Sequence, residues 1–129
     1  MKKYVFIAEK TTTGFSAYAK DDDITVGATG KTITELKERI LEAFNALNKI
    51  ENKKPVSEDS ISIELNIPQF FEYFSDLIKA KGVAKRIEMN HTLLSQYIGG
   101  EKTPSKKQTE KIVAGLKEVA KEILELDYA

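Results

Sequence analysis

Residues 26–32, VGATGKT, resemble the end of a phosphate-binding loop. Such a loop follows the pattern G-x-x-x-x-G-K-[ST], whose first glycine would stand five residues before Gly30. That position holds Thr25, and the chain has no second apolar strand ending in an aspartate that could hold magnesium. We therefore interpret the stretch as the passage from a strand into a helix, and we predict no bound nucleotide or other cofactor.

Acidic residues in the first third of the chain raise the question of a magnesium-dependent nuclease, which uses clustered carboxylates. The candidate acids are Glu9, Asp21, Asp22, Asp23 and Glu35. Three successive aspartates cannot converge on one ion, because neighbours on an extended chain point in opposite directions. A solvated turn is the favoured interpretation. The chain also has no cysteine and one histidine, so we predict neither a metal site nor catalytic residues.

Side chains that can read DNA bases gather in residues 90–96. Asparagine and glutamine pair with adenine edges in the major groove, while serine and threonine pair with several bases. A lysine-rich loop, residues 99–107, follows at once and offers contacts to the DNA backbone. The predicted base-facing residues are Asn90, His91, Thr92, Ser95 and Gln96, and the predicted phosphate contacts are Lys85, Lys102, Lys106 and Lys107.

The charge distribution supports a polyanion as the partner of this segment. The chain of 129 residues has 20 basic and 20 acidic residues, so its net charge is zero. Between Lys79 and Lys111, however, eight basic residues stand against three acidic ones, a local charge of +5. A locally basic segment can meet DNA without the whole chain being basic.

The first half of the chain shows the pattern of a small sheet with one helix. Short strands are predicted at residues 4–8 and 15–19, and a third is predicted to start at residues 24–26. Thr32 and Glu35 form a capping box that begins a helix running to about residue 49. Residues 61–67 then alternate between apolar and polar side chains, which predicts a fourth strand.

The second half has only helical patterns. Pro68 begins a helix that Gly82 is expected to end, and two short helices, a loop and a long final helix follow. One face of the final helix carries Ile112, Leu116, Val119, Ile123 and Leu126. The sequence therefore predicts an α+β protein with a β-β-β-α-β domain over residues 1–67 and an all-helical domain over residues 68–129.

The apolar pattern of residues 80–100 is that of a helix-turn-helix, with Ala84 as the small residue where the two helices touch. The expected core residues are Val83, Ile87, Met89, Leu94 and Tyr97. Asn90 is placed to cap the second helix. The turn needs a positive φ, which usually requires glycine, and this position holds Glu88. The competing interpretation is a plain helical hairpin with a solvated, lysine-rich face.

Two resemblances follow from these motifs. Residues 80–105 are similar to the helix-turn-helix of phage-repressor-type regulators, with LLSQYIGGEKTPS as the second helix and the loop after it. Nearly the whole chain resembles the HicB family of antitoxins, through the turns, strands and helix of residues 11–44, TTTGFSAYAKDDDITVGATGKTITELKERILEAF.

The resemblance to HicB implies a partial RNase H-like N-terminal domain and a type II toxin–antitoxin function. The N-terminal domain would neutralise a HicA-like mRNA interferase toxin, and the helix-turn-helix would repress the protein's own operon as a homodimer or higher homo-oligomer. We expect a cytoplasmic protein, which the absence of cysteine fits. We expect no membrane segments, since no apolar run approaches the ~20 residues of a membrane helix. The alternative is a stand-alone transcriptional regulator whose N-terminal domain senses a ligand or mediates assembly.

Overall fold

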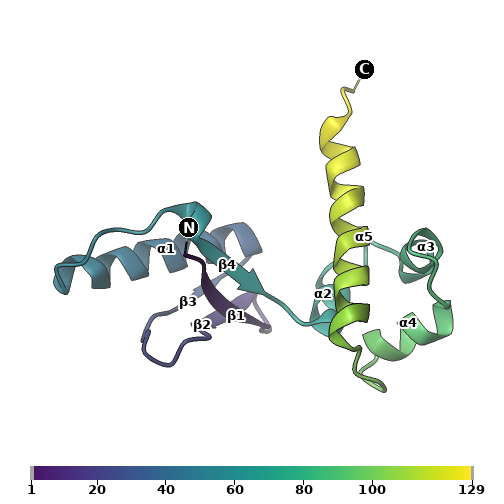
Figure 1. Ribbon diagram of the computed structural model, residues 1–129, viewed down its shortest axis with the longest axis horizontal. Coiled ribbons are helices and arrows are strands. Elements are labelled where there is room, and N and C mark those ends of the chain that lie inside the picture. Colours follow the sequence, from purple (N-terminus) through teal and green to yellow (C-terminus); the bar gives the residue numbers. More distant parts are fainter. Residues whose placement is uncertain (1, 129) are drawn as a thin grey trace. The chain divides into compact units, whose positions relative to one another are not determined.

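A computed structural model describes residues 2–128 and divides them into two compact units, with the boundary between Leu65 and Asn66. The first unit holds strands β1 (Tyr4–Lys10), β2 (Phe15–Ala19), β3 (Gly27–Gly30) and β4 (Ile61–Glu64), helix α1 (Ile33–Ile50) and the short 3-10 turn η1 (Glu58–Ser60). The second unit holds helices α2 (Ile67–Tyr73), α3 (Ala80–Arg86), α4 (His91–Ile98) and α5 (Lys106–Glu125) (Figure 1). The chain is therefore α+β.

The first unit is a four-stranded mixed sheet in the order β3-β2-β1-β4. β2 is antiparallel to both β1 and β3, whereas β4 is parallel to β1. A parallel neighbour requires a crossover connection, and the segment that contains α1 provides it. Helix α1 packs on the sheet with its apolar stripe, where Leu36, Ile40 and Phe44 are buried, and the Phe44 ring lies 6.1 Å from the ring of Phe6 in β1.

The third strand lies later in the chain than the sequence predicts. Residues 24–26 precede it, and β3 consists of Gly27–Gly30, with Ala28 opposite Ala17 of β2. Val26, which is buried, packs from the loop instead of the strand. Glycine is a poor strand former, but a Cβ atom at Gly30 would lie 2.6 Å from the Leu36 nitrogen. The close approach of strand and helix therefore outweighs local propensity.

Two further element boundaries, one on each side of the division between the two units, differ from the prediction. The alternating pattern predicted a strand to Ile67, but β4 ends at Glu64 and Ile67 is the first residue of α2, capped by the side chain of Asn66. The prediction of one helix from Pro68 to Gly82 is wrong. α2 ends at Tyr73, where the Ser75 hydroxyl donates to the Glu72 carbonyl at 3.2 Å. A serine that bonds to the backbone in this way competes with helix propagation.

Within the described residues, no helix is both long and apolar enough to cross a membrane.

Candidate nucleic-acid interface

The acidic segment of the first unit forms a turn. The Asp21 carboxylate accepts a hydrogen bond from the Asp23 amide at 2.9 Å, and the Ile24 amide donates to the Asp21 carbonyl at 3.0 Å. This is the local bonding pattern by which aspartate stabilises turns. Among the residues that the structure describes, no three His, Cys, Asp or Glu side chains are arranged to hold a metal ion.

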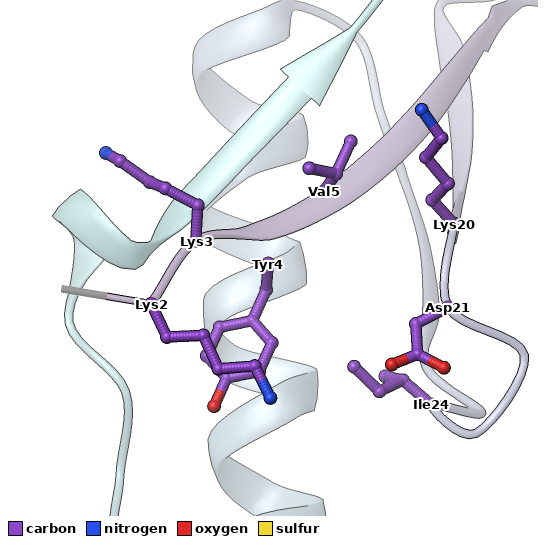
Figure 2. Close-up of a pocket in the computed structure, with 7 residues that line it drawn as sticks. All are labelled: Lys2, Lys3, Tyr4, Val5, Lys20, Asp21 and Ile24. Carbon is purple, nitrogen blue, oxygen red and sulfur yellow. The ribbon is translucent and has the colours of Figure 1, made fainter.

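A hollow of about 240 Å³ lies beside this turn, at the start of β1 (Figure 2). Lys2, Lys3 and Lys20 line it, but each already has a partner. Lys2 lies 5.0 Å from the centre of the Tyr4 ring, and the Lys3 ammonium donates to a backbone carbonyl. The Lys20 ammonium is 3.5 Å from the Glu64 carboxylate. Ligand pockets are usually about 300–1,000 Å³ and more enclosed by apolar side chains, so this hollow offers little to a small molecule.

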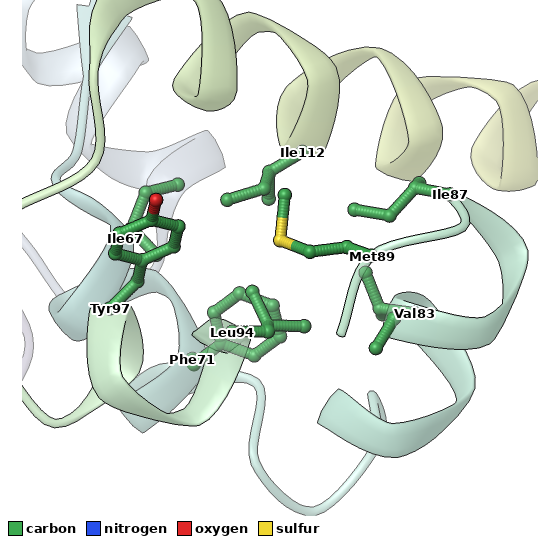
Figure 3. Packing of buried hydrophobic residues seen from close by; sticks show 9 residues of the cluster. Ile67, Phe71, Val83, Ile87, Met89, Leu94, Tyr97 and Ile112 are labelled. Carbon is green, nitrogen blue, oxygen red and sulfur yellow. The ribbon is translucent and has the colours of Figure 1, made fainter. Parts of the chain in front are cut away.

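The second unit has a single apolar core to which all four of its helices or their turns contribute (Figure 3). Every residue predicted for the helix-turn-helix core is buried, and Leu94 at its centre is fully so. The buried set consists of Ile67, Phe71, Val83, Ala84, Ile87, Met89, Leu94, Tyr97 and Ile112. α3 and α4 are therefore held in a fixed arrangement by burial, and the small residue Ala84 of α3 is buried in this core.

The turn between α3 and α4 has the geometry predicted for a helix-turn-helix. Glu88 has a φ of 54°, so glutamate occupies the left-handed position that usually holds glycine. The Met89 amide donates to the Ala84 carbonyl at 2.9 Å, and the Glu88 amide donates to the Lys85 carbonyl at 3.3 Å. These two bonds form a Schellman motif, which ends α3 and fixes the direction in which the chain enters α4.

Asn90 is the N-cap of α4, as predicted. Its side-chain oxygen accepts a hydrogen bond from the Leu93 amide at 3.2 Å. A bidentate pair with adenine needs that same oxygen as the acceptor for the base amino group. The cap therefore competes with the base-reading role predicted for Asn90, and we assign this residue first to positioning α4.

The other predicted base-facing residues lie on the face of α4 that points away from the core. His91, Thr92 and Ser95 are exposed, and Gln96 is half-buried. Leu94 and Tyr97, on the inner face, are buried. Residues three and four apart are neighbours on a helix, so the four polar side chains form one continuous strip. We call residues 91, 92, 95 and 96 the polar strip of α4.

Three of the predicted phosphate contacts, Lys102, Lys106 and Lys107, lie in the segment that follows the C-terminal end of α4. Gly100, with a φ of 80°, turns the chain out of α4, and the Lys102 amide donates back to the Gln96 carbonyl at 3.2 Å. Lys106 and Lys107 are exposed in the first turn of α5, where Ser105 caps the helix by accepting from the Gln108 amide at 3.1 Å. A helix N-terminus carries partial positive charge, which adds to that of the lysines.

α3 contributes one more of the predicted phosphate contacts and one residue that the sequence did not single out. Lys85 is exposed near the C-terminal end of α3. Its neighbour Arg86 forms an ion pair with Glu122 of α5, so the charge of Arg86 is already compensated within the chain. The two residues stand 36 positions apart in the sequence, and nothing in the local pattern marks them as partners.

Gly115 is a second structural residue that sequence reasoning missed. It lies where α5 packs against the end of α3, and a Cβ atom there would be 2.2 Å from the Ile87 side chain. Glycine is unfavourable inside a helix, so an isolated glycine in a helical pattern could have indicated this close packing.

Comparison of the chain with protein-family models, with curated proteins and with solved structures finds no match.

Proposed function

We propose that the second unit binds double-stranded DNA and that α4 enters the major groove. The observation that carries this proposal is the polar strip of α4. Three of its four side chains are exposed and the fourth, Gln96, is half-buried, on a helix whose direction is fixed by the Schellman turn at Glu88 and the cap at Asn90. A recognition helix needs both properties, because base reading depends on presenting a few polar groups at a constant angle.

DNA binding also requires contacts to phosphates, which the lysines near the polar strip can supply. Contacts to phosphates supply most of the affinity and set the register, while contacts to base edges supply the sequence preference. Lys102, Lys106 and Lys107 are exposed in the loop after α4 and in the first turn of α5, and Lys85 is exposed on α3. The proposed interface therefore combines base-reading groups with exposed lysines of the same unit.

We further propose that the chain is a HicB-like antitoxin that represses its own operon. The element order β1-β2-β3-α1-β4 in the first unit, followed by a helix-turn-helix, is the order that the resemblance implies. In this proposal the first unit has the partial RNase H-like fold and neutralises a HicA-like mRNA interferase. The chain itself has no enzymatic activity, needs no cofactor and acts in the cytoplasm as a homodimer or higher homo-oligomer.

The two halves of the proposal have separate tests. For DNA binding, a gel shift on the DNA upstream of the coding sequence is measured at low and at moderate salt. A shift at low salt that weakens as salt rises is expected, and no shift at low salt would contradict DNA binding. For the antitoxin function, the chain is co-expressed with the product of the neighbouring gene. Co-purification and relief of that product's toxicity are expected.

The alternative function is that of a stand-alone transcriptional regulator. It shares the DNA-binding unit and differs in what the first unit does. A short neighbouring gene for a basic protein of double-stranded-RNA-binding type favours the antitoxin. DNA binding without any such gene, and without effect on the toxicity of any co-expressed partner, favours the regulator.

A further inference from the structure

Glu101 places a carboxylate at the end of the helix that carries the polar strip. It is exposed in the segment between α4 and α5, directly before Lys102, one of the predicted phosphate contacts. The phosphates of a duplex repel a carboxylate, whatever the base sequence. A glutamate at this place must therefore weaken DNA binding unless its carboxylate also meets a favourable group.

The backbone on both sides of Glu101 is shaped by the last turn of α4. Gly100, which precedes it, has a φ of 80° and turns the chain back. The amide of Lys102, which follows it, donates to the Gln96 carbonyl at 3.2 Å. Glu101 is therefore tied to the end of α4.

The Glu101 carboxylate lies on the side of α4 that carries the polar strip. Gly99 still has a helical backbone, with a φ of −77° and a ψ of −6°, and it follows Ser95 by four residues. Residues four apart are neighbours on one helix face, so a side chain at position 99 would extend the strip. A Cβ atom built at Gly99 would lie 3.7 Å from Oε1 of Glu101. The carboxylate therefore lies beside the place that such a side chain would occupy.

The chemistry of a carboxylate limits which base it can meet in the major groove. An ionised carboxylate can accept hydrogen bonds but cannot donate them. Guanine and thymine present only acceptors to hydrogen bonds there, and adenine presents its amino donor beside the acceptor N7. Cytosine presents its N4 amino donor alone. Cytosine is therefore the base that an acceptor-only side chain fits best.

We propose that Glu101 is a specificity-determining residue that accepts a hydrogen bond from the N4 amino group of a cytosine, next to the bases read by the polar strip. On other sequences its charge meets acceptors and phosphates without compensation, so it weakens binding to them. Specificity is a difference between affinities, and a penalty against wrong sequences increases it as much as a gain on the right one does. This inference rests on the proposed DNA binding by α4 and adds the base that the end of the interface reads.

Three variants of the full chain separate the base contact from the charge. Glu101→Gln removes the charge and keeps the size of the side chain, whereas Glu101→Asp keeps the charge and shortens the side chain. The matched control is Glu118→Gln, which removes the same charge from an exposed residue of α5. Glu118 lies on the order of 20 Å along the helix from the Ser105 cap. The Debye length is about 10 Å at 0.1 M salt, so the charge of Glu118 is screened from the interface.

Fluorescence anisotropy is measured on the duplex upstream of the coding sequence, on a scrambled duplex and on a series of upstream duplexes with one changed base pair each. Glu101→Gln should bind the scrambled duplex more tightly and reduce the preference for the upstream duplex by about fivefold or more. Glu101→Asp should reduce the preference without binding the scrambled duplex more tightly, and Glu118→Gln should change neither affinity. In the series, replacement of one C·G pair should weaken binding of the unmodified protein but not of Glu101→Gln.

Two results would count against different parts of the account. If Glu101→Gln strengthens binding to both duplexes equally, and no base pair has an effect that depends on residue 101, the inference is overturned while DNA binding stands. If the unmodified protein binds neither duplex at low salt, the proposed function falls and the inference falls with it.

Discussion

Replacing Gly115 by alanine tests the packing of α5 against the helix-turn-helix. The added Cβ atom would lie 2.2 Å from Cγ2 of Ile87, much closer than carbon atoms can approach. Ile87 has little room to yield, because it is 9% exposed and its β-branched side chain has few χ1 alternatives. It also ends α3 directly before the turn at Glu88. Relief of the clash must therefore displace either a core side chain or α5.

Two opposing effects set the size of the change. Overpacking in a core costs about 1–3 kcal/mol. Alanine instead of glycine in a helix interior stabilises by about 1 kcal/mol. We therefore expect Gly115→Ala to lower the free energy of unfolding by up to about 2 kcal/mol. For a domain of this size, each kcal/mol corresponds to a shift of about 4–8 °C in Tm.

Gly82 provides the matched control. It also lies within a helix, α3, but nothing in the described part of the chain lies within 4 Å of a Cβ atom built there. Gly82→Ala should therefore stabilise the protein by about 0.5–1 kcal/mol, since only the helix propensity changes. The two glycines thus predict opposite signs for the same substitution.

Urea unfolding followed by circular dichroism measures both variants and closes a double-mutant cycle with Ile87→Ala. That substitution removes Cγ2, so Gly115→Ala in the Ile87→Ala background should become stabilising by about 1 kcal/mol. The coupling between the two sites should then reach about 1–3 kcal/mol. If Gly115→Ala stabilises the unmodified chain as much as Gly82→Ala does, with no coupling to Ile87, the packing described here is refuted.

Three further predictions concern the turn, the sheet and the proposed interface. Glu88→Gly should raise the free energy of unfolding, read from the urea midpoint, by about 0.5–1 kcal/mol. A side chain at positive φ costs about 1–2 kcal/mol, and the greater conformational entropy of glycine in the unfolded chain offsets part of the gain from removing it. Glu88→Ala, which keeps the Cβ atom, should bring no such gain. Gly30→Ala should lower the free energy of unfolding of the first unit by about 3 kcal/mol or less, since the new Cβ atom meets the Leu36 nitrogen at 2.6 Å. Added ATP should change the Tm of neither the unmodified protein nor this variant if the stretch binds no phosphate. Lys106→Gln or Lys107→Gln should weaken binding to every duplex alike and reduce the slope of log K against log salt by about 0.9; an unchanged slope would remove that lysine from the interface.

The features that the sequence predicts correctly depend on local chemistry. The Thr32 hydroxyl accepts from the Glu35 amide at 3.1 Å, because a cap needs only a hydroxyl at the right place before an amphipathic run. The positive φ at Glu88 follows from the geometry of the turn, and the burial of Leu94 and Tyr97 follows from helical periodicity. In each case the determining residues lie within a few positions of one another.

The errors arise where contacts between distant segments decide the outcome. β3 begins at Gly27 and ends at Gly30, because the Gly30 backbone must approach α1 closely. Strand propensity depends on the residue type alone and cannot predict that approach. The ion pair between Arg86 and Glu122 likewise cannot be predicted from a local sequence pattern. Periodicity assigned Ile112 and Ile123 to one face of the last helix, but it could not show that the core covers only the first of them.

The central claim is that the polar strip of α4 reads DNA sequence, and fluorescence anisotropy with two duplexes tests it most directly. One duplex carries the DNA upstream of the coding sequence, and the other is a scrambled duplex of equal length. Thr92→Ala is compared with Thr34→Ala, in which an exposed threonine of α1 is changed in the same way. Thr92→Ala should weaken binding to the upstream duplex by about 1–3 kcal/mol and leave the scrambled duplex unaffected, while Thr34→Ala changes neither. Equal affinity of the unmodified protein for both duplexes, or equal effects of the two substitutions, would contradict the claim.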